Sequence, residues 1–526
     1  MRVLIRCDAS RSIGIGHLVR CRNLARVLVG RVDEIVFICR AHIDGLHRQL
    51  LLGEFKLIEL PTREYHLSKG LPSEHSKWLG CSEEQDFNDC IKAMDDAEIQ
   101  DIDAAIVDHY GLSSIWHQSL KSVYEDVRIL VIDDLANRKH DADWLLDSNR
   151  LGGWSDNSYL HLLNDGCQKL LGPFFAPLSP EYASLRPYLP IRNYLRRVLI
   201  FFGGVDKDDF CSLALRALRS ETFDSLAVDV VIGEGAPHLS EIRELIDGFP
   251  GASLHVGLPS LAGLIARADL AIGAAGTNSW ERTCLGLPSI VIPVASNQVQ
   301  GAEALASVGA ARCIKIDASD DAIDRLRSAV LDILRSPDEL LEMSVACRCL
   351  GDGYGLQRVV TALIGPNPAM RLRKANMSDL SLYFHWVNDP LVRQFSFCSD
   401  VVPFSDHCQW YETRLLSPDS LLYVLVDSDG LPLGQIRFDR TAHSPSRAVI
   451  GFSLDRLARG RGFSDQLLRL GLDQLWRCWG AAMEAYAEVQ SDNPASARAF
   501  LKVGFQEITK QDQEMRCFRK MANSMV

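Results

Sequence analysis

Short apolar runs alternate with amphipathic stretches through the first two thirds of the chain. Between the runs, apolar residues recur on one helix face, as they do in residues 18–28 before Gly30. Strand–helix alternation of this kind predicts a parallel sheet in an α/β fold. The first four runs are short, β-branched and bounded by polar or glycine residues, which is typical of buried strands: Arg2–Cys7, Glu34–Arg40, Ala104–His109 and Arg128–Asp133.

A second series of strands and helices begins after the proline-containing stretch Pro173–Pro190. We expect two facing doubly wound domains with a cleft between them, residues 1–190 and 191–366. In such sheets ligands bind beyond the carboxyl ends of the strands. The second series has five predicted strands: Arg196–Gly204, Ala227–Gly233, Ala252–Gly257, Ala268–Gly276 and Pro288–Val294.

The pattern changes after the Pro/Gly-rich stretch Ile364–Met370. The next segment predicts a strand, followed by a helix with Ser378 as its N-cap. Residues Leu421–Arg440 predict an antiparallel hairpin with Asp429 and Gly430 at its turn. The sequence therefore predicts a third, α+β domain over residues 369–526.

Composition narrows the class of protein. The 526 residues are 47% hydrophobic and 24% charged, as in ordinary globular proteins. A net charge of -12 argues against non-specific binding to nucleic acid or acidic membranes. The 15 cysteines are scattered without a CxxC pair, so we expect reduced thiols and no metal. Without a signal-peptide pattern or an apolar run of membrane-spanning length, we expect a cytoplasmic protein that is not inserted in a membrane.

A glycine turn followed by a histidine stands directly after the first predicted strand, in the sequence "RSIGIGHLVRC". Gly14 and Gly16 would let the backbone turn tightly and approach a ligand, at a helix N-terminus that favours anions. His17 would then lie at the ligand edge as a general acid or base. The alternative is a histidine that only caps or packs at this turn.

The segment "MRVLIRCDASRSIGIGHLVRCRNLARVL" resembles the start of the UDP-sugar hydrolases of pseudaminic acid biosynthesis. The resemblance continues through "AIVDHYGL", "FFGGVDKDD" and "GTNSWERTCLGLPSIVIPVASNQ", and covers most of residues 1–365. It implies a GT-B-like fold and removal of UDP from UDP-2,4-diacetamido-2,4,6-trideoxy-altropyranose by water, with inversion. It also implies that His17 is the catalytic base.

Inversion in one displacement needs a base on one face of the sugar and stabilisation of the departing charge on the other. Glu281 resembles the acidic residue that GT-B enzymes place on the nucleotide ribose. The glycine pair Gly203–Gly204 forms a second turn at the same sheet edge, although such pairs are often only tight turns. Backbone amides of a predicted helix start are candidates to hold the diphosphate: Gly276, Thr277, Asn278 and Ser279.

Several polar residues at strand ends are further candidates. Asp8 and Asp108 would orient His17 or bind sugar hydroxyls, although aspartates there also serve as helix N-caps. Asn297, with Gln298 beside it, would contact the sugar or the base. Tyr110 and Asp134 are weaker candidates.

The third domain carries an Arg/Gly turn before an amphipathic helix: Arg459, Gly460, Arg461 and Gly462. Such a turn would direct N–H groups and positive charge at a diphosphate, or would be only an exposed basic turn. This segment resembles the acetyl-CoA motif of the GNAT acetyltransferases, with Ser464 where that family has Gly or Ala. The resemblance implies acetyl-CoA as cosubstrate.

Downstream, "NPASARAFLKVGF" resembles the second GNAT signature, in which Asn493 would help to bind the cofactor. Phe500 stands where many members carry a tyrosine that protonates the leaving thiolate. Glu488 is a candidate base toward the acceptor amine, or a glutamate at a strand edge in solvent. "LRKANMSDLSLYFHWVNDPLVRQFSF" resembles the beginning of the GNAT family that acetylates the 4-amino group of the UDP-altrose precursor.

The sequence therefore predicts a bifunctional enzyme of two consecutive reactions, acetyl-CoA-dependent N-acetylation of a UDP-4-amino sugar and hydrolysis of the UDP-sugar product. One alternative is a UDP-sugar-dependent GT-B glycosyltransferase fused to an acetyltransferase. Another is a non-catalytic sugar-nucleotide-binding module fused to a protein acetyltransferase.

Overall fold

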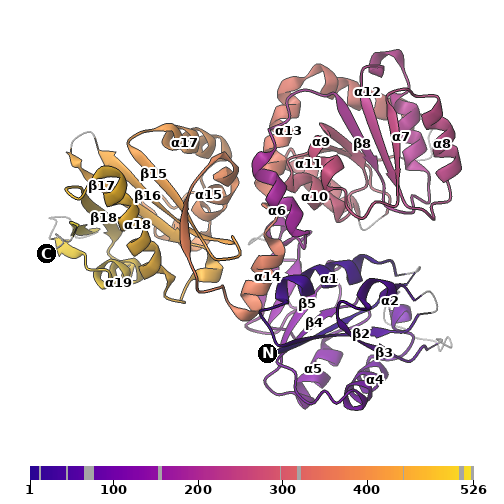
Figure 1. Cartoon of the computed structure of the whole chain (residues 1–526), viewed down its shortest axis with the longest axis horizontal. Helices are drawn as coiled ribbons and strands as arrows, with labels where there is room; N and C mark the ends of the chain where they lie inside the picture. The colour runs from indigo at the N-terminus through magenta and orange to yellow at the C-terminus, as the bar shows by residue number, and fades with distance from the viewer. Residues whose placement is uncertain are drawn as a thin grey trace. The chain divides into compact units, whose positions relative to one another are not determined.

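The computed structural model describes residues 1–10, 13–42, 45–63, 76–151, 157–295, 298–316, 321–441, 444–508 and 515–522 (Figure 1). Its contacts divide the chain into two compact units, Met1–Val359 and Val360–Val526. No helix within the described residues is long and apolar enough to cross a bilayer.

The N-terminal half of the first unit is a parallel sheet in the order β3-β2-β1-β4-β5-β6-β7. The strand order reverses between β1 and β4, which places a ligand-binding switch point at their carboxyl ends. The strands are β1 (Arg2–Cys7), β2 (Glu34–Arg40), β3 (Lys56–Leu60), β4 (Ala104–Asp108), β5 (Arg128–Ile132), β6 (Trp144–Asp147) and β7 (Gln168–Leu171).

Helices cover both faces of this sheet. Figure 1 shows α1 and α2 on one face and α4 and α5 on the other. Strands β1 and β4 are almost completely buried because each packs against helices on both sides. The helices are α1 (Gly16–Leu28), α2 (Leu46–Leu51), α3 (Ser76–Leu79), α4 (Glu83–Asp96) and α5 (Ser114–Val123).

The C-terminal half of the first unit is a second parallel sheet, in the order β10-β9-β8-β11-β12-β13. The strand order of this sheet also reverses, here between β8 and β11. The strands are β8 (Arg197–Phe201), β9 (Ala227–Ile232), β10 (Ala252–Val256), β11 (Leu270–Gly273), β12 (Ser289–Val291) and β13 (Ala311–Cys313).

The helices of this half also lie on both faces of their sheet. In Figure 1, α7, α8 and α12 lie on one face, while α9, α10 and α11 lie on the other. Their bounds, with those of the helices that precede and follow them, are α6 (Pro180–Leu185), α7 (Phe210–Leu218), α8 (Leu239–Asp247), α9 (Ala262–Arg267), α10 (Asn278–Cys284), α11 (Val299–Ser307), α12 (Ala322–Arg335), α13 (Pro337–Leu350) and α14 (Gly355–Ile364).

The second unit is a mixed sheet in the order β14-β15-β16-β17-β18-β20-β19. Strands β17 and β18 of this sheet pair in parallel, and they do so only from Arg447 to Val449 on β17. Beyond that point the two strands separate. The strands are β14 (Arg371–Lys374), β15 (Ser420–Val426), β16 (Pro432–Thr441), β17 (Ser444–Leu454), β18 (Glu484–Gln490), β19 (Gln506–Ile508) and β20 (Met515–Lys520).

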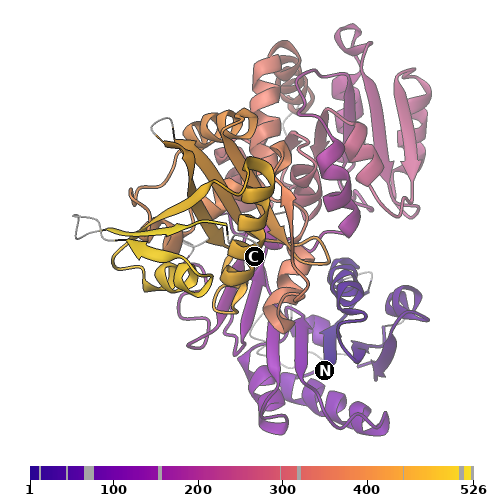
Figure 2. The same cartoon turned by 60° about the vertical axis from the view of Figure 1, so that its left-hand side comes forward.

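Alternate residues of β16 face different helices of the second unit, and Figure 2 shows helices on both sides of this sheet. Ile436 and Phe438 lie against Gly471 of α18, while Arg437 lies over the ring of Trp410 in α17. Helices α17 and α18 therefore cover opposite faces. The helices are α15 (Leu380–Val387), α16 (Pro390–Gln394), α17 (Phe404–Leu416), α18 (Phe463–Trp479) and α19 (Pro494–Lys502).

The predicted fold class, two doubly wound α/β halves followed by an α+β domain, is confirmed by these three sheets. The hairpin at Asp429–Gly430 is confirmed by the antiparallel pairing of β15 with β16. The N-cap prediction was wrong. Asn376 accepts the N–H of Ser378, and Asp379 closes a capping box, so α15 begins only at Leu380.

Candidate active sites

The glycine turn places His17 in the first turn of α1, just beyond the carboxyl end of β1. Gly14 has φ +85° and donates its N–H to the carbonyl of Ser10 at 2.7 Å. This left-handed conformation is one that a glycine adopts without strain. No atom lies within 4 Å of a Cβ built on Gly14 or Gly16. The turn is therefore open toward a ligand beside the imidazole.

Asp108 is the residue that orients His17. It ends β4, directly across from Cys7 at the end of β1, and its Oδ1 lies 2.7 Å from Nδ1 of the imidazole. The carboxylate is fully buried and His17 is 8% exposed. Because Nδ1 faces Asp108, Nε2 is the ring nitrogen that remains for a substrate or a water molecule.

Arg20, one turn further along α1, holds the same carboxylate by two hydrogen bonds. Its Nη2 donates to Oδ1 of Asp108 at 2.5 Å and its Nε donates to Oδ2 at 2.6 Å. Burial alone would raise the pKa of Asp108, but the charge of Arg20 and the contact with His17 hold that pKa well below its usual value. Asp108 therefore stays ionised and accepts a hydrogen bond from Nδ1–H of His17.

Aromatic rings enclose the imidazole. Tyr110 meets it edge-on with ring centroids 4.6 Å apart, and Trp78 lies 6.1 Å from it. The Tyr110 hydroxyl donates to Asp134. Burial, followed by the charge of Asp134, raises the pKa of Tyr110, so the phenol remains protonated. Neither Trp78 nor the role of Arg20 was predicted, because no local sequence pattern points to them.

Asp8 lies in a different environment from the one the sequence suggested. Its carboxylate accepts from the Arg6 guanidinium at 2.5 Å and from the backbone N–H of Arg40 at 2.7 Å, inside a buried ion network. Burial would raise the pKa of Asp8, but Arg6 and His109 hold it well below its usual value. The structure thus pairs His17 with Asp108 and holds Asp8 within the core.

In the C-terminal half, the turn after β8 is also open. Gly203 has φ +101°, and no atom lies within 4 Å of a Cβ built on Gly203 or Gly204. The start of α7 is not open in the same way, because Asp206 accepts the N–H groups of Phe210 and Cys211 at 3.1 and 2.8 Å. An anion at this edge would therefore meet the glycine turn rather than the start of α7.

The segment 276–281 starts α10, as predicted, with the helix beginning at Asn278. A Cβ built on Gly276 would have no neighbouring atom closer than 4.0 Å. Thr277 is exposed. The Ser279 hydroxyl, in contrast, is buried and accepts from Arg282 at 2.9 Å. The backbone of this turn is thus open to a ligand, but the Ser279 side chain points into the core.

Glu281 is held by the side chains around it. It accepts from the Asn278 amide and is hydrogen-bonded to Tyr182. Burial raises the pKa of Glu281 to about 7, against the lowering effect of these two hydrogen bonds. The carboxylate is therefore placed to accept hydroxyl hydrogen bonds but is costly to ionise without a ligand.

This cost predicts a pH dependence for Glu281→Gln. The ordinary pKa of 4.5 rises to about 7 on folding, so the buried charge costs nothing below pH 4.5 and costs most above pH 7. In ligand-free protein we expect the Gln variant to gain stability relative to the wild type as pH rises from 5 to 8. Urea unfolding at both pH values measures this, with the exposed Glu125→Gln as control. A stability difference that does not change with pH would contradict the assignment.

A hydrogen-bond chain joins the two halves of the first unit. The Trp280 indole of α10 donates to Asn149 Oδ1 at 2.8 Å, and Asn149 Nδ2 donates to Asp134 at 3.3 Å. Asp134 in turn accepts from Tyr110 beside His17.

The predicted contact residue Asn297 lies outside the described residues. Its neighbour Gln298 accepts the N–H of Val294 at 3.2 Å.

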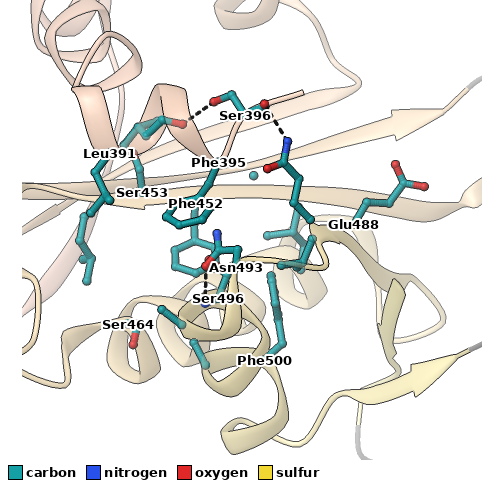
Figure 3. Close-up of a pocket in the computed structure, with 18 of the residues that line it drawn as sticks. Leu391, Phe395, Ser396, Phe452, Ser453, Ser464, Glu488, Asn493, Ser496 and Phe500 are labelled. Carbon is teal, nitrogen blue, oxygen red and sulfur yellow. Dashed lines mark hydrogen bonds between the residues drawn. The ribbon is translucent and has the colours of Figure 1, made fainter. Parts of the chain in front are cut away.

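The second unit contains a cavity of about 640 Å³ where β17 and β18 separate (Figure 3). Its walls include residues from both strands, from the start of α18 and from α19. Of the residues singled out from the sequence, six line it: Arg459, Gly460, Ser464, Glu488, Asn493 and Phe500. Neither Arg461 nor Gly462 is among its lining residues, and both are exposed.

Residues 370–506 match the model of the acetyltransferase (GNAT) domain. The second unit is a GNAT domain. Residues 198–349 match the glycosyltransferase family 28 C-terminal domain. Together with the described geometry, these matches support enzymatic activity in both units.

Three curated relatives are similar to the chain at low identity. An uncharacterized protein of Methanocaldococcus jannaschii is 21% identical, with 98% of both chains covered. The spore coat polysaccharide biosynthesis protein SpsG of Bacillus subtilis is 26% identical over 69% of this chain and 98% of its own. The UDP-2,4-diacetamido-2,4,6-trideoxy-beta-L-altropyranose hydrolase of Campylobacter jejuni is 23% identical over 59% of this chain and 97% of its own. These similarities fit the fusion that the sequence predicts.

Within the GNAT domain, the Arg459 side chain lines the cavity and is also engaged by neighbouring segments. Its Nε donates to the carbonyl of Leu454 at 3.0 Å, and its Nη1 pairs with Asp389 at 3.0 Å. The guanidinium therefore ties the turn to neighbouring segments. What the turn offers a ligand is its backbone, where Gly460 and Gly462 both have positive φ and open space.

Asn493 both lines the cavity and caps α19. Its Oδ1 accepts the N–H of Ser496 at 3.1 Å, as Figure 3 shows. The side-chain amide nitrogen is the part of Asn493 that can act as a donor to a ligand. The capping interpretation and the binding interpretation are therefore compatible.

Phe500 belongs to an aromatic cluster with Phe452, Phe505 and Phe518, at centroid distances of 5.0–5.6 Å. It has no proton to donate. Glu488 lines the same cavity and accepts from the Tyr486 hydroxyl at 3.1 Å. Among the residues that the structure describes, no group of three or more His, Cys, Asp or Glu side chains could hold a metal ion.

Proposed function

We propose that the chain is a bifunctional enzyme. The first unit hydrolyses UDP-2,4-diacetamido-2,4,6-trideoxy-β-L-altropyranose to UDP and the free sugar with inversion. The GNAT domain transfers an acetyl group from acetyl-CoA to the amine of the UDP-4-amino sugar precursor. The observation that carries the hydrolase proposal is the His17–Asp108 pair at the switch point of the first sheet.

In the hydrolysis, Nε2 of His17 takes a proton from water while the water oxygen attacks C1 of the sugar. The bond from C1 to the UDP oxygen breaks on the opposite face, and UDP leaves with the bonding electrons. Asp108 stabilises the imidazolium that forms, as an ionised partner on Nδ1 does in other His–Asp pairs. Backbone amides at Gly203, Gly204 and Gly276 would hold the departing diphosphate, and Glu281 the ribose hydroxyls.

In the acetyl transfer, the neutral amine attacks the thioester carbonyl, the C–S bond breaks and the coenzyme leaves as a thiolate. The amine must lose one proton and the thiolate must gain one. Glu488 would accept the amine proton through water. Because Phe500 has no proton to give, the thiolate proton would come from solvent or from another group of the cavity.

The relatives support this combination. The relative that aligns over 59% of this chain is named as the hydrolase of the same UDP-sugar, and residues 370–506 match the acetyltransferase (GNAT) domain model. The two reactions are chemically consecutive, since the acetylated UDP-sugar is the substrate of the hydrolase. The match to glycosyltransferase family 28 favours a sugar-nucleotide glycosyltransferase as the second candidate. Release of free sugar without any acceptor separates the two.

The test is incubation of the pure protein with UDP-4-amino-4,6-dideoxy-2-acetamido-altrose and acetyl-CoA, followed by mass spectrometry. We expect gain of one acetyl group and then release of UDP and free diacetamido sugar. Acetylation without UDP release would overturn the hydrolase proposal, and an unchanged substrate would overturn the acetyltransferase proposal.

A further inference from the structure

The GNAT domain contains a second cavity, of about 410 Å³, between α15, α17 and the β16–β17 face. It shares a wall with the first cavity along Gly451–Ser453 of β17, and Arg437 of β16 lines both. An amine must reach the thioester for acetyl transfer to occur. The first cavity is lined by residues predicted to bind the coenzyme, so the adjoining cavity is where an acceptor can bind. The residues that line it determine which acceptors fit.

Gln435 supplies an unsatisfied acceptor in this second cavity. Its Nε2 donates to Ser453 Oγ at 3.2 Å, while its Oε1 is buried and has no hydrogen-bond partner within the described part of the chain. Ser453 lines both cavities. A buried carbonyl oxygen without a donor carries an uncompensated desolvation cost. An N–H of a bound amine would remove that cost at the boundary between the two cavities.

Arg437 supplies a positive charge in a fixed position. Its guanidinium lies 5.1 Å from the ring centroid of Trp410, as a cation–π pair. A Cβ built on Gly451 would lie 2.9 Å from Nε of Arg437, so a side chain at residue 451 would displace the guanidinium. The glycine at residue 451 therefore allows Arg437 to lie across the sheet.

The charges around Arg437 leave it able to bind an anion. Asp439 lies 3.3 Å from its Nε and faces Arg414 as well. Arg393, which also lines both cavities, adds a second positive charge. Asp406 lines the second cavity as an exposed residue. A guanidinium that lines a cavity suits a phosphate, which it binds through paired N–H donors.

We propose that the second cavity is the acceptor site and that it selects an anionic primary amine. Gln435 Oε1 accepts an N–H of the attacking amine, and Arg437 binds the phosphate of the same molecule. This inference rests on the proposed acetyl transfer and deepens it, because it explains a preference for a nucleotide-linked amino sugar. A polycationic amine would be repelled by Arg437 and Arg393.

The test is thiol release from acetyl-CoA by the full chain, which reports on the GNAT domain alone. Arg437→Ala is expected to raise KM for the UDP-amino sugar by about 10–100-fold, as expected for loss of a charged hydrogen bond, a much larger change than in KM for acetyl-CoA. The same amino sugar without UDP should show no such change. Arg440→Ala is the matched control, since that guanidinium lies 4.2 Å from the ring of Trp479, away from both cavities. Gln435→Leu should lower kcat.

The possible failures are distinguishable. Acetylation of the UDP-amino sugar that is insensitive to Arg437→Ala overturns this inference and leaves the acetyltransferase proposal standing. An equal loss with the amino sugar that lacks UDP overturns the phosphate contact. Acetylation of a polyamine or a peptide but of no anionic amine, or of no amine at all, overturns both.

Discussion

Replacing His17 with alanine is expected to lower the rate of UDP release by about 10²–10⁴-fold, the usual contribution of a positioned general base. The imidazole is held by an ionised carboxylate on Nδ1 and enclosed by aromatic rings, so its Nε2 has a fixed direction. Water at C1 would have no base in the variant. UDP release in single-turnover assays measures the effect.

Thiol release by the GNAT domain serves as an internal control for the folding of the His17→Ala chain and should be unchanged. His161→Ala, at an exposed histidine of the same half, should retain full hydrolysis. Asp108→Asn should also be impaired, because an amide does not stabilise an imidazolium as a carboxylate does. Full hydrolysis by His17→Ala would exclude His17 as the base.

Replacing Asp86 with alanine is expected to have the largest effect on stability, a loss of about 3–5 kcal/mol from the first unit. Asp86 lies on α4 and is fully buried, and it accepts from Arg6 at 2.8 Å and from Arg40. Both guanidiniums are also buried. Without this shared carboxylate, two positive charges remain in the core, and the other acidic groups balance only part of them.

Guanidinium chloride unfolding of the full chain measures this loss, with UDP release and thiol release as separate reports on the two units. Glu54→Ala is the control, because Glu54 pairs with Arg22 and Arg26 at the surface and such pairs contribute about 0–1 kcal/mol. A loss for Asp86→Ala no larger than that of Glu54→Ala would show that the buried network does not stabilise the fold.

The strands that bring the candidate site together were predictable because buried parallel strands are short apolar runs. Strands β3, β6, β7 and β13 were not singled out, since they are short and lack a continuous apolar run. The choice between Asp8 and Asp108 was not predictable either. Both residues follow apolar runs at the same sheet edge, and only the direction of α1 decides which carboxylate meets His17.

Contacts between distant segments carry no local pattern, which limits the prediction of the GNAT site as well. The Arg/Gly turn was found from its sequence, but the engagement of Arg459 by Asp389 depends on a helix start seventy residues earlier in the chain. The acceptor cavity depends on how α15 and α17 pack on the sheet and on the absence of a side chain at Gly451. None of these relations has a spacing that the sequence reveals.

The position of Asn149 between Trp280 and Asp134 has a consequence for which residues can replace it. An amide presents opposite polarity at its two ends, so Asn149 accepts from an indole and donates to a carboxylate at the same time. Aspartate has the same shape but would set two like charges against each other, and leucine would satisfy neither neighbour. The contact between the two halves therefore tolerates few substitutions at residue 149.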